Sequence, residues 1–217
     1  MRIKISGLLS ALVLFCFLFS PVSYAGSSVD VYRAPGVGKK IIPGYNDIVI
    51  PFDSARVPAA NAPTWSSLIG NLNAYVFDIN DYLEGSGELY HSYEHYSNVY
   101  PHLHWITNGL DVTDRAVNWE IEFTRANMDS GGVGSVFPAT TIITAEATIP
   151  ANTPDLTHMY TELPDMSGSS LKIGTYVKVR VRRVAAVGAD PTNDPFALAV
   201  GLHIKENTIG SKTRSSK

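Results

Sequence analysis

The chain has 217 residues, of which 45% are hydrophobic and 17% are charged, and its formal net charge is −3. This slight acidic excess does not favour nucleic acid as a partner. Cys16 is the only cysteine, which excludes an internal disulfide framework, so the fold has to rest on a hydrophobic core. A chain of this length is sufficient for one such core, and we expect one folded domain.

Residues 1–25 have the pattern of a secretory signal peptide. Arg2 and Lys4 form a short basic start, 8–19 is an apolar run, and 23–25 (Ser-Tyr-Ala) is a small-x-small cleavage pattern. The apolar run is short for a membrane span. We therefore expect cleavage before Gly26, export to the periplasm or the outside, and no membrane attachment afterwards. An uncleaved membrane anchor is the alternative.

The mature chain divides into an arm, one β domain and a tail. Removing the signal lowers the 17 basic residues to 15 against 20 acidic ones, a net charge of −5. Residues 26–45 are rich in Gly and Pro and predict an extended arm, 46–209 predict the β domain, and 210–217 predict a flexible basic tail. The arm has too little apolar periodicity to fold alone, and ordering it without a partner is costly. We therefore expect a homo-oligomer, with a trimer as the candidate.

The β domain consists of short strands separated by turns rich in Gly, Pro, Asn and Asp. The expected strands are 46–52, 73–79, 88–95, 99–106, 116–124, 140–149, 157–163, 172–184 and 196–205. This pattern predicts an all-β fold, a single-domain antiparallel jelly roll or β-sandwich. Only 64–72 (TWSSLIGNL) allows a short helix, with Thr64 as its N-cap.

Alternation within 99–106 assigns its side chains to two faces. Leu103 and Trp105 point to one side of the strand, and His102 and His104 point to the other. Because the large apolar residues take the core side, the histidines belong to the polar side of a half-exposed sheet.

The strand 116–124 alternates in the same way, with Trp119 on the apolar side and Glu120 on the polar side. If it forms a hairpin with 99–106, Trp105 lies opposite Trp119 and His104 lies opposite Glu120. A histidine opposite a glutamate favours the protonated imidazole, so we expect a raised histidine pKa.

His-x-His on one strand face is also a pattern of metal ligands. The candidates for a metal site are His102, His104, His203 and Glu120. The favoured interpretation is a structural or interface role for the imidazoles, with no metal and no other cofactor. A cupin-like metal-binding protein stays open as an alternative, because His203 and Asn207 resemble the second cupin motif, although the glutamate and glycine of the first motif are missing after His104.

No catalytic residue is predicted, and we do not expect an enzyme. Glu120 and Glu122 lie two apart on one strand face, which offers a carboxylate pair of the type used in glycoside hydrolysis. They share their strand face with basic residues and histidines, so neutralised surface charge is the favoured interpretation.

A dense aromatic segment offers a candidate surface for a glycan or a partner protein. It consists of Tyr90, His91, Tyr93, His95 and Tyr96. This segment motivates the alternative of a secreted carbohydrate-binding or adhesive β-sandwich.

Several motifs, in order along the chain, resemble a family of small β-rich virion structural proteins of tailed bacteriophages and prophages. The family pattern is Pro-His-x-His-Trp, a Trp-x-x-Glu strand running into Ala-Asn, Phe-Pro-x-Thr, and a final His-x-x-x-Asn-Thr-x-Gly-Ser. The matching positions are Pro101, His102, His104, Trp105, Trp119, Glu122, Ala126, Asn127, Phe137, Pro138, Thr140, His203, Asn207, Thr208, Gly210 and Ser211. The resemblance implies a jelly-roll component of a particle or appendage, located in the virion, with other particle or surface proteins as partners. The export signal departs from that family.

Overall fold

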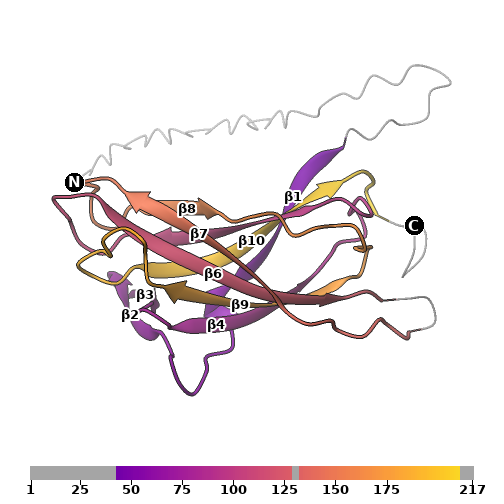
Figure 1. Ribbon diagram of the computed structural model, residues 1–217, viewed down its shortest axis with the longest axis horizontal. Coiled ribbons are helices and arrows are strands. Elements are labelled where there is room, and N and C mark those ends of the chain that lie inside the picture. Colours follow the sequence, from indigo (N-terminus) through magenta and orange to yellow (C-terminus); the bar gives the residue numbers. More distant parts are fainter. Residues whose placement is uncertain (1–42, 129–131, 211–217) are drawn as a thin grey trace, which may run out of the picture. The chain divides into compact units, whose positions relative to one another are not determined.

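In the computed structural model, which describes residues 43–128 and 132–210, strands form two antiparallel sheets packed face to face (Figure 1). The six-stranded sheet holds β1 (Gly44–Pro51), β2 (Thr64–Ile69), β3 (Leu72–Val76), β5 (Val99–Ile106), β8 (His158–Glu162) and β10 (Phe196–Glu206). The four-stranded sheet holds β4 (Tyr82–Glu88), β6 (Arg115–Ala126), β7 (Thr141–Ile149) and β9 (Tyr176–Val184). A single 3-10 turn, η1 (Phe52–Ser54), is the one helical element of the described residues.

The strand pairing is nested. β1 pairs with β10, β4 with β9, β5 with β8 and β6 with β7, so the chain forms one long hairpin. β10 also pairs with β5, and β9 also pairs with β6, which rolls this hairpin into the orders β1-β10-β5-β8 and β4-β9-β6-β7. An eight-stranded antiparallel roll of this kind is a jelly roll, and the prediction of that fold class is confirmed. The β2–β3 hairpin is an addition, joined to the start of β10 through β3.

Apolar side chains from both sheets fill the space between them. The rings of Trp105 on β5 and Trp119 on β6 lie 6.1 Å apart between centroids, and Phe77 packs edge-on against Trp119 at 5.6 Å. Both tryptophans are fully buried, and the indole N–H of Trp105 donates to Thr161 Oγ1 at 2.8 Å. A buried hydrogen bond of this kind removes the cost of placing an indole N–H in the core.

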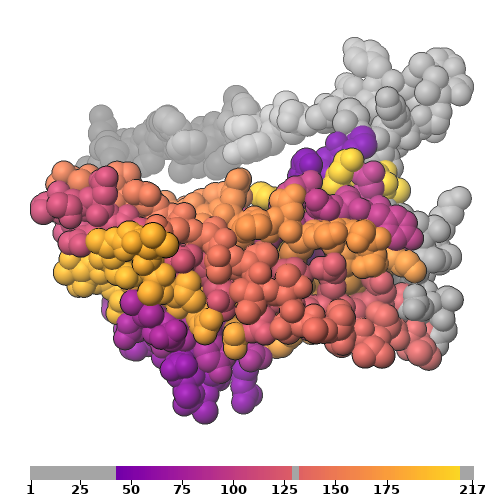
Figure 2. All heavy atoms as spheres, in the orientation of Figure 1, coloured from indigo at the N-terminus to yellow at the C-terminus, as the bar shows by residue number. Residues whose placement is uncertain are grey.

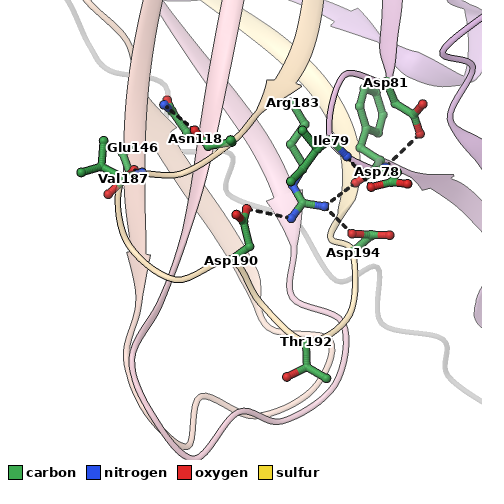
Figure 3. Close-up of polar contacts among 12 residues, drawn as sticks. Asp78, Ile79, Asp81, Asn118, Glu146, Arg183, Val187, Asp190, Thr192 and Asp194 are labelled. Carbon is green, nitrogen blue, oxygen red and sulfur yellow. Dashed lines mark hydrogen bonds and ion pairs between the residues drawn. The ribbon is translucent and has the colours of Figure 1, made fainter.

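Arg183 closes one end of the core (Figure 3). It continues the inward-facing series of β9, and its side chain is 1% exposed. The guanidinium donates to the Phe77 carbonyl at 2.8 Å and to Asp190 at 3.1 Å, and it also binds Asp194. Because a buried charge is stable only when paired, this cluster fixes the segment after β9 against the segment after β3.

The predicted hairpin of 99–106 with 116–124 is wrong. β5 pairs with β10 and β8, whereas β6 pairs with β7 and β9 in the other sheet. Trp105 and Trp119 do face each other, but across the interior. Two apolar strand faces can meet either side by side or through the core, and alternation does not distinguish these arrangements. His104 and Glu120 therefore point away from opposite sides of the sandwich.

The predicted helix at 64–72 is also wrong, because this segment forms β2 and the turn into β3. Trp65 and Ile69 favour a strand, and Gly70, with φ of +56°, occupies the two-residue turn between the paired Ile69 and Leu72.

The strand expected at 88–95 lies earlier, as β4, and residues 89–98 form turns. Glycines at 85 and 87 obscured β4 in the sequence. A Cβ at Gly85 would lie 2.4 Å from Ile50 Cγ2, so the bare backbone there makes room for a core side chain.

The predicted signal peptide, most of the predicted arm and nearly all of the predicted tail lie outside the described residues. β1 begins at Gly44, within the last two residues of the predicted arm.

Candidate functional site

Four of the six histidines lie together on the outer side of the six-stranded sheet. The register of the strands causes this arrangement. On β5, His104 lies opposite Tyr160, and His102 lies opposite Glu162 and Gly201. On β10, His203 lies opposite Asp47. Outward positions on four adjacent strands thus form one patch. This group, called the histidine face below, consists of Asp47, His102, His104, His158, Tyr160 and His203.

His102 is the centre of the histidine face and is 1% exposed. Its ring packs against Tyr160 at 4.8 Å and His203 at 4.2 Å between centroids. Gly201, its cross-strand neighbour, makes this position accessible, because a Cβ there would lie 2.1 Å from His102 Nε2. The imidazole therefore lies flat over the backbone of β10 and reaches toward β1.

Burial, followed by the nearby His203 charge, lowers the pKa of His102 to about 4, although Asp47 partly opposes the shift. Burial also lowers the pKa of His104, with the charge of His158 as the second cause. The expectation of a raised histidine pKa is therefore wrong. Loss of hydration outweighs the nearby carboxylate, and at neutral pH both rings are neutral.

Asp47 of β1 joins two of these histidines. His203 Nε2 lies 3.1 Å from Asp47 Oδ1, and His102 Nε2 lies 4.0 Å from Asp47 Oδ2. The three donor atoms come from three adjacent strands and lie within 4.8 Å of one another. The sequence-based candidate set did not include Asp47. Alternation in "NDIVIPF" assigns it to a polar face, but only the pairing of β1 with β10 places it beside His203.

The other two histidines bind each other. His104 Nδ1 and His158 Nε2 are 3.0 Å apart, and their rings stack with centroids 5.2 Å apart and planes 10° apart. One nitrogen donates its proton and the other accepts it, so both atoms are occupied.

Glu120 does not belong to this site. It lies on the outer side of the four-stranded sheet, where Arg182 donates to its carboxylate at 2.8 Å, and Arg180 pairs with its neighbour Glu122. We call these outward residues the charged cluster: Glu84, Glu120, Glu122, Lys178, Arg180 and Arg182. Arg180 also lies 3.9 Å from Glu120, so the two carboxylates share one guanidinium, which favours the interpretation as neutralised surface charge.

The aromatic segment between β4 and β5 divides by burial. Tyr93 is fully buried, and its hydroxyl donates to the Ser97 carbonyl, so it cannot belong to an exposed binding surface. Tyr90 and Tyr96 are 44% and 56% exposed, and His95 packs edge-on against Tyr96. His91 and His95 are half-buried.

A second candidate surface is the β2–β3 hairpin, which belongs to the purple region at the lower edge of Figure 2. Trp65, Ile69 and Leu72 are 47%, 59% and 67% exposed, and we call them the apolar edge. β2 is the last strand on its side of the sheet, so it also presents unpaired backbone groups. Proteins usually protect such an edge with charges or proline.

A groove of about 390 Å³ adjoins the histidine face. Its lining includes Tyr45, Tyr100, Tyr160, Glu162, Asp165 and His203. Three tyrosine rings beside two carboxylates give a surface that is both flat and hydrogen-bonding.

Comparisons with known proteins yield little. No protein-family model and no curated protein matches the sequence. Among solved structures, a chain of Desmodium yellow mottle tymovirus aligns with 83% of this chain and 97% of its own length, at 9% identity and a TM-score of 0.24. A likeness at this score carries no argument, and the fold assignment rests on the strand pairing above. No helix among the described residues is long and apolar enough to cross a membrane.

Proposed function

We propose that the chain is a non-enzymatic structural protein that assembles with further copies of itself through the apolar edge. The observation that supports this is the combination of an unpaired strand edge with three large exposed apolar side chains. Contiguous apolar surface at a free sheet edge marks a protein interface or an aggregation site.

The composition of the hairpin favours a second copy as the occupant. No charged residue occurs between Arg56 and Asp78, although the chain as a whole has a net charge. Two identical edges can therefore meet without like-charge repulsion, in the self-complementary contact that a two-fold dimer requires. The hairpin is anchored for this role, because Ala74 packs with Ile106 and Phe196 in a small buried cluster at its base.

The motif resemblance supports the same function. Its members occupy framework positions: Trp105 and Trp119 form the centre of the core, and His102 and His203 lie together on the histidine face. A pattern that specifies framework rather than a catalytic group suits a particle component. We propose other particle or surface proteins as further partners.

The signal pattern of residues 1–25 adds export to this proposal, with location in a virion as the alternative. Mass spectrometry of the native protein should find an N-terminus at Gly26. An intact Met1 in a particle fraction would refute cleavage and favour the virion.

Light scattering of the full chain over a concentration series tests the assembly proposal. We expect an oligomer that Ile69→Lys converts to monomer, because it places a charge on both sides of the contact. Val187→Lys is the matched control, since Val187 is 94% exposed and belongs to the loop between β9 and β10 rather than to the hairpin. A monomeric wild-type chain at all concentrations, or an oligomer that Ile69→Lys leaves intact, would refute the proposal.

The groove beside the histidine face favours a second candidate function, the binding of a glycan. Tyrosine rings pack against sugar faces, and Glu162 and Asp165 accept hydrogen bonds from hydroxyl groups. Glycan-array binding that Tyr100→Ala abolishes and Tyr90→Ala preserves would support it. An array without any signal would rule it out.

A further inference from the structure

Asp47, His102 and His203 form an arrangement that the assembly proposal does not use. Both imidazoles direct Nε2 toward one carboxylate, from separate strands of a sheet. The separation of 4.0 Å between His102 Nε2 and Asp47 Oδ2 is too long for a hydrogen bond. His203 Nε2 contacts this carboxylate at 3.1 Å, whereas His102 Nε2 lies beside it without a hydrogen bond.

We propose that Asp47, His102 and His203 bind a divalent transition-metal ion of the zinc type. His102 and His203 provide Nε2, and Asp47 provides a carboxylate oxygen. Two imidazoles and one carboxylate are a ligand set that suits zinc and its neighbours in the first transition row. Ligands that each lie about 2 Å from an ion are separated by up to roughly 4 Å, close to the spacing found here.

The site is preorganised at its buried ligand. Tyr160 and His203 pack against the ring of His102, and the absence of a side chain at Gly201 lets the ring extend over β10.

The other two ligands have room to adjust. The side chains of Asp47 and His203 are 36% and 37% exposed, so small rotations bring their donor atoms to the ion. The exposed side of the site faces solvent, and water completes the coordination there.

The charges around Asp47 also favour a bound cation. Among the described residues, the ion-pair partners of the Asp47 carboxylate are only these two imidazoles. In the charged cluster, by contrast, an arginine or lysine accompanies Glu84, Glu120 and Glu122. A bound cation supplies the positive charge that the protein does not place beside Asp47.

The neighbouring pair His104 and His158 provides a matched control, because its two facing nitrogens already bind each other. The untagged full chain is stripped with chelator, and Zn²⁺ is titrated by calorimetry and Co²⁺ by visible absorption. We expect one ion per chain and a rise in the unfolding temperature. Asp47→Asn and His203→Gln should weaken binding by at least about tenfold, whereas His158→Gln should leave it unchanged.

Binding of Zn²⁺ to the wild-type chain that is only roughly millimolar or weaker would overturn the proposal. So would binding that survives in Asp47→Asn and disappears in His158→Gln. Ile69→Lys should still bind one ion, because all three ligands belong to one chain, and this result separates the metal site from the assembly proposal.

Discussion

The outer sides of the two sheets differ in how their carboxylates are balanced by neighbouring side chains. On the four-stranded sheet, Glu120 lies directly opposite Arg182 and Glu122 opposite Arg180, and each pair forms an ion pair. On the six-stranded sheet, the equivalent outward positions hold imidazole and tyrosine rings beside Asp47. In the charged cluster, an arginine or a lysine neutralises each glutamate. The histidine face is neutral at its centre and offers nitrogen lone pairs.

The charged cluster therefore has the character of ordinary protein surface, whereas the histidine face is a candidate binding site. Exposed ion pairs on a sheet contribute little stability and do not require a ligand. A buried neutral histidine, in contrast, gives up hydration, so its position needs compensation from packing or from a bound group. Substitutions in the core, the histidine face and the charged cluster should therefore differ in their cost to stability.

A substitution in the core between the two sheets should have the largest effect on stability. Trp105→Ala should reduce the free energy of unfolding by about 3–5 kcal/mol, because a fully buried indole leaves a cavity and Thr161 loses its donor. Trp65→Ala is the control, since Trp65 is 47% exposed, and it should change stability by about 0.5 kcal/mol. Urea melts measure both. Equal losses would contradict the burial assigned to the two tryptophans.

Acid should weaken the histidine face selectively. The pKa of His102 falls from 6.5 to about 4 on folding, so between these pH values the unfolded chain binds more protons than the folded one. Stability is then complete above pH 6.5 and decreases as the pH falls toward 4, by ~3 kcal/mol in total. Urea melts in chelator across this range should show a flatter pH dependence for His102→Gln. Identical slopes for the two proteins would contradict the burial effect.

Gly201→Ala should destabilise the chain by about 1–3 kcal/mol, because the new methyl group overlaps the His102 ring and one of them has to move. Gly44→Ala is the control on the neighbouring strand β1, where no atom lies within 4 Å of the added carbon. Thermal unfolding of the two variants gives the comparison. A Gly201→Ala protein as stable as the control would mean that His102 does not lie over β10.

The charged cluster should be the most tolerant region. Glu122→Gln removes one ion pair with Arg180, at a site where both side chains are partly exposed. The expected cost is about 0.2–1 kcal/mol, and it should shrink further at high salt. Denaturant melts at two salt concentrations test this. A loss comparable with that of Trp105→Ala would show that the pair is far more important than its exposure implies.

Local alternation predicted much of this arrangement. Because β-strand side chains alternate strictly, the sequence correctly assigned His102 and His104 to the outer side and Leu103 and Trp105 to the core. Alternation cannot specify which strands become neighbours. Asp47 meets His203 only through a register between segments far apart in the chain, and that register depends on packing of the whole core.

Two other features were not accessible from sequence for related reasons. The sequence around Gly201 does not indicate that an imidazole packs against this glycine. Tyr93 occurs among polar residues in the sequence, but its ring is fully buried in the core. In both cases the deciding contact is made with an element that is not adjacent in sequence.

The nested pairing also has a consequence for how the chain acquires its structure. β10 lies between β1 and β5, yet it follows the other strands of the described residues along the chain, so the six-stranded sheet lacks its middle until synthesis reaches Glu206. Within the roll, apart from the added β2–β3 hairpin, β6 and β7 are the pair closest in sequence, and the remaining pairs close progressively longer loops. Such a high contact order slows folding.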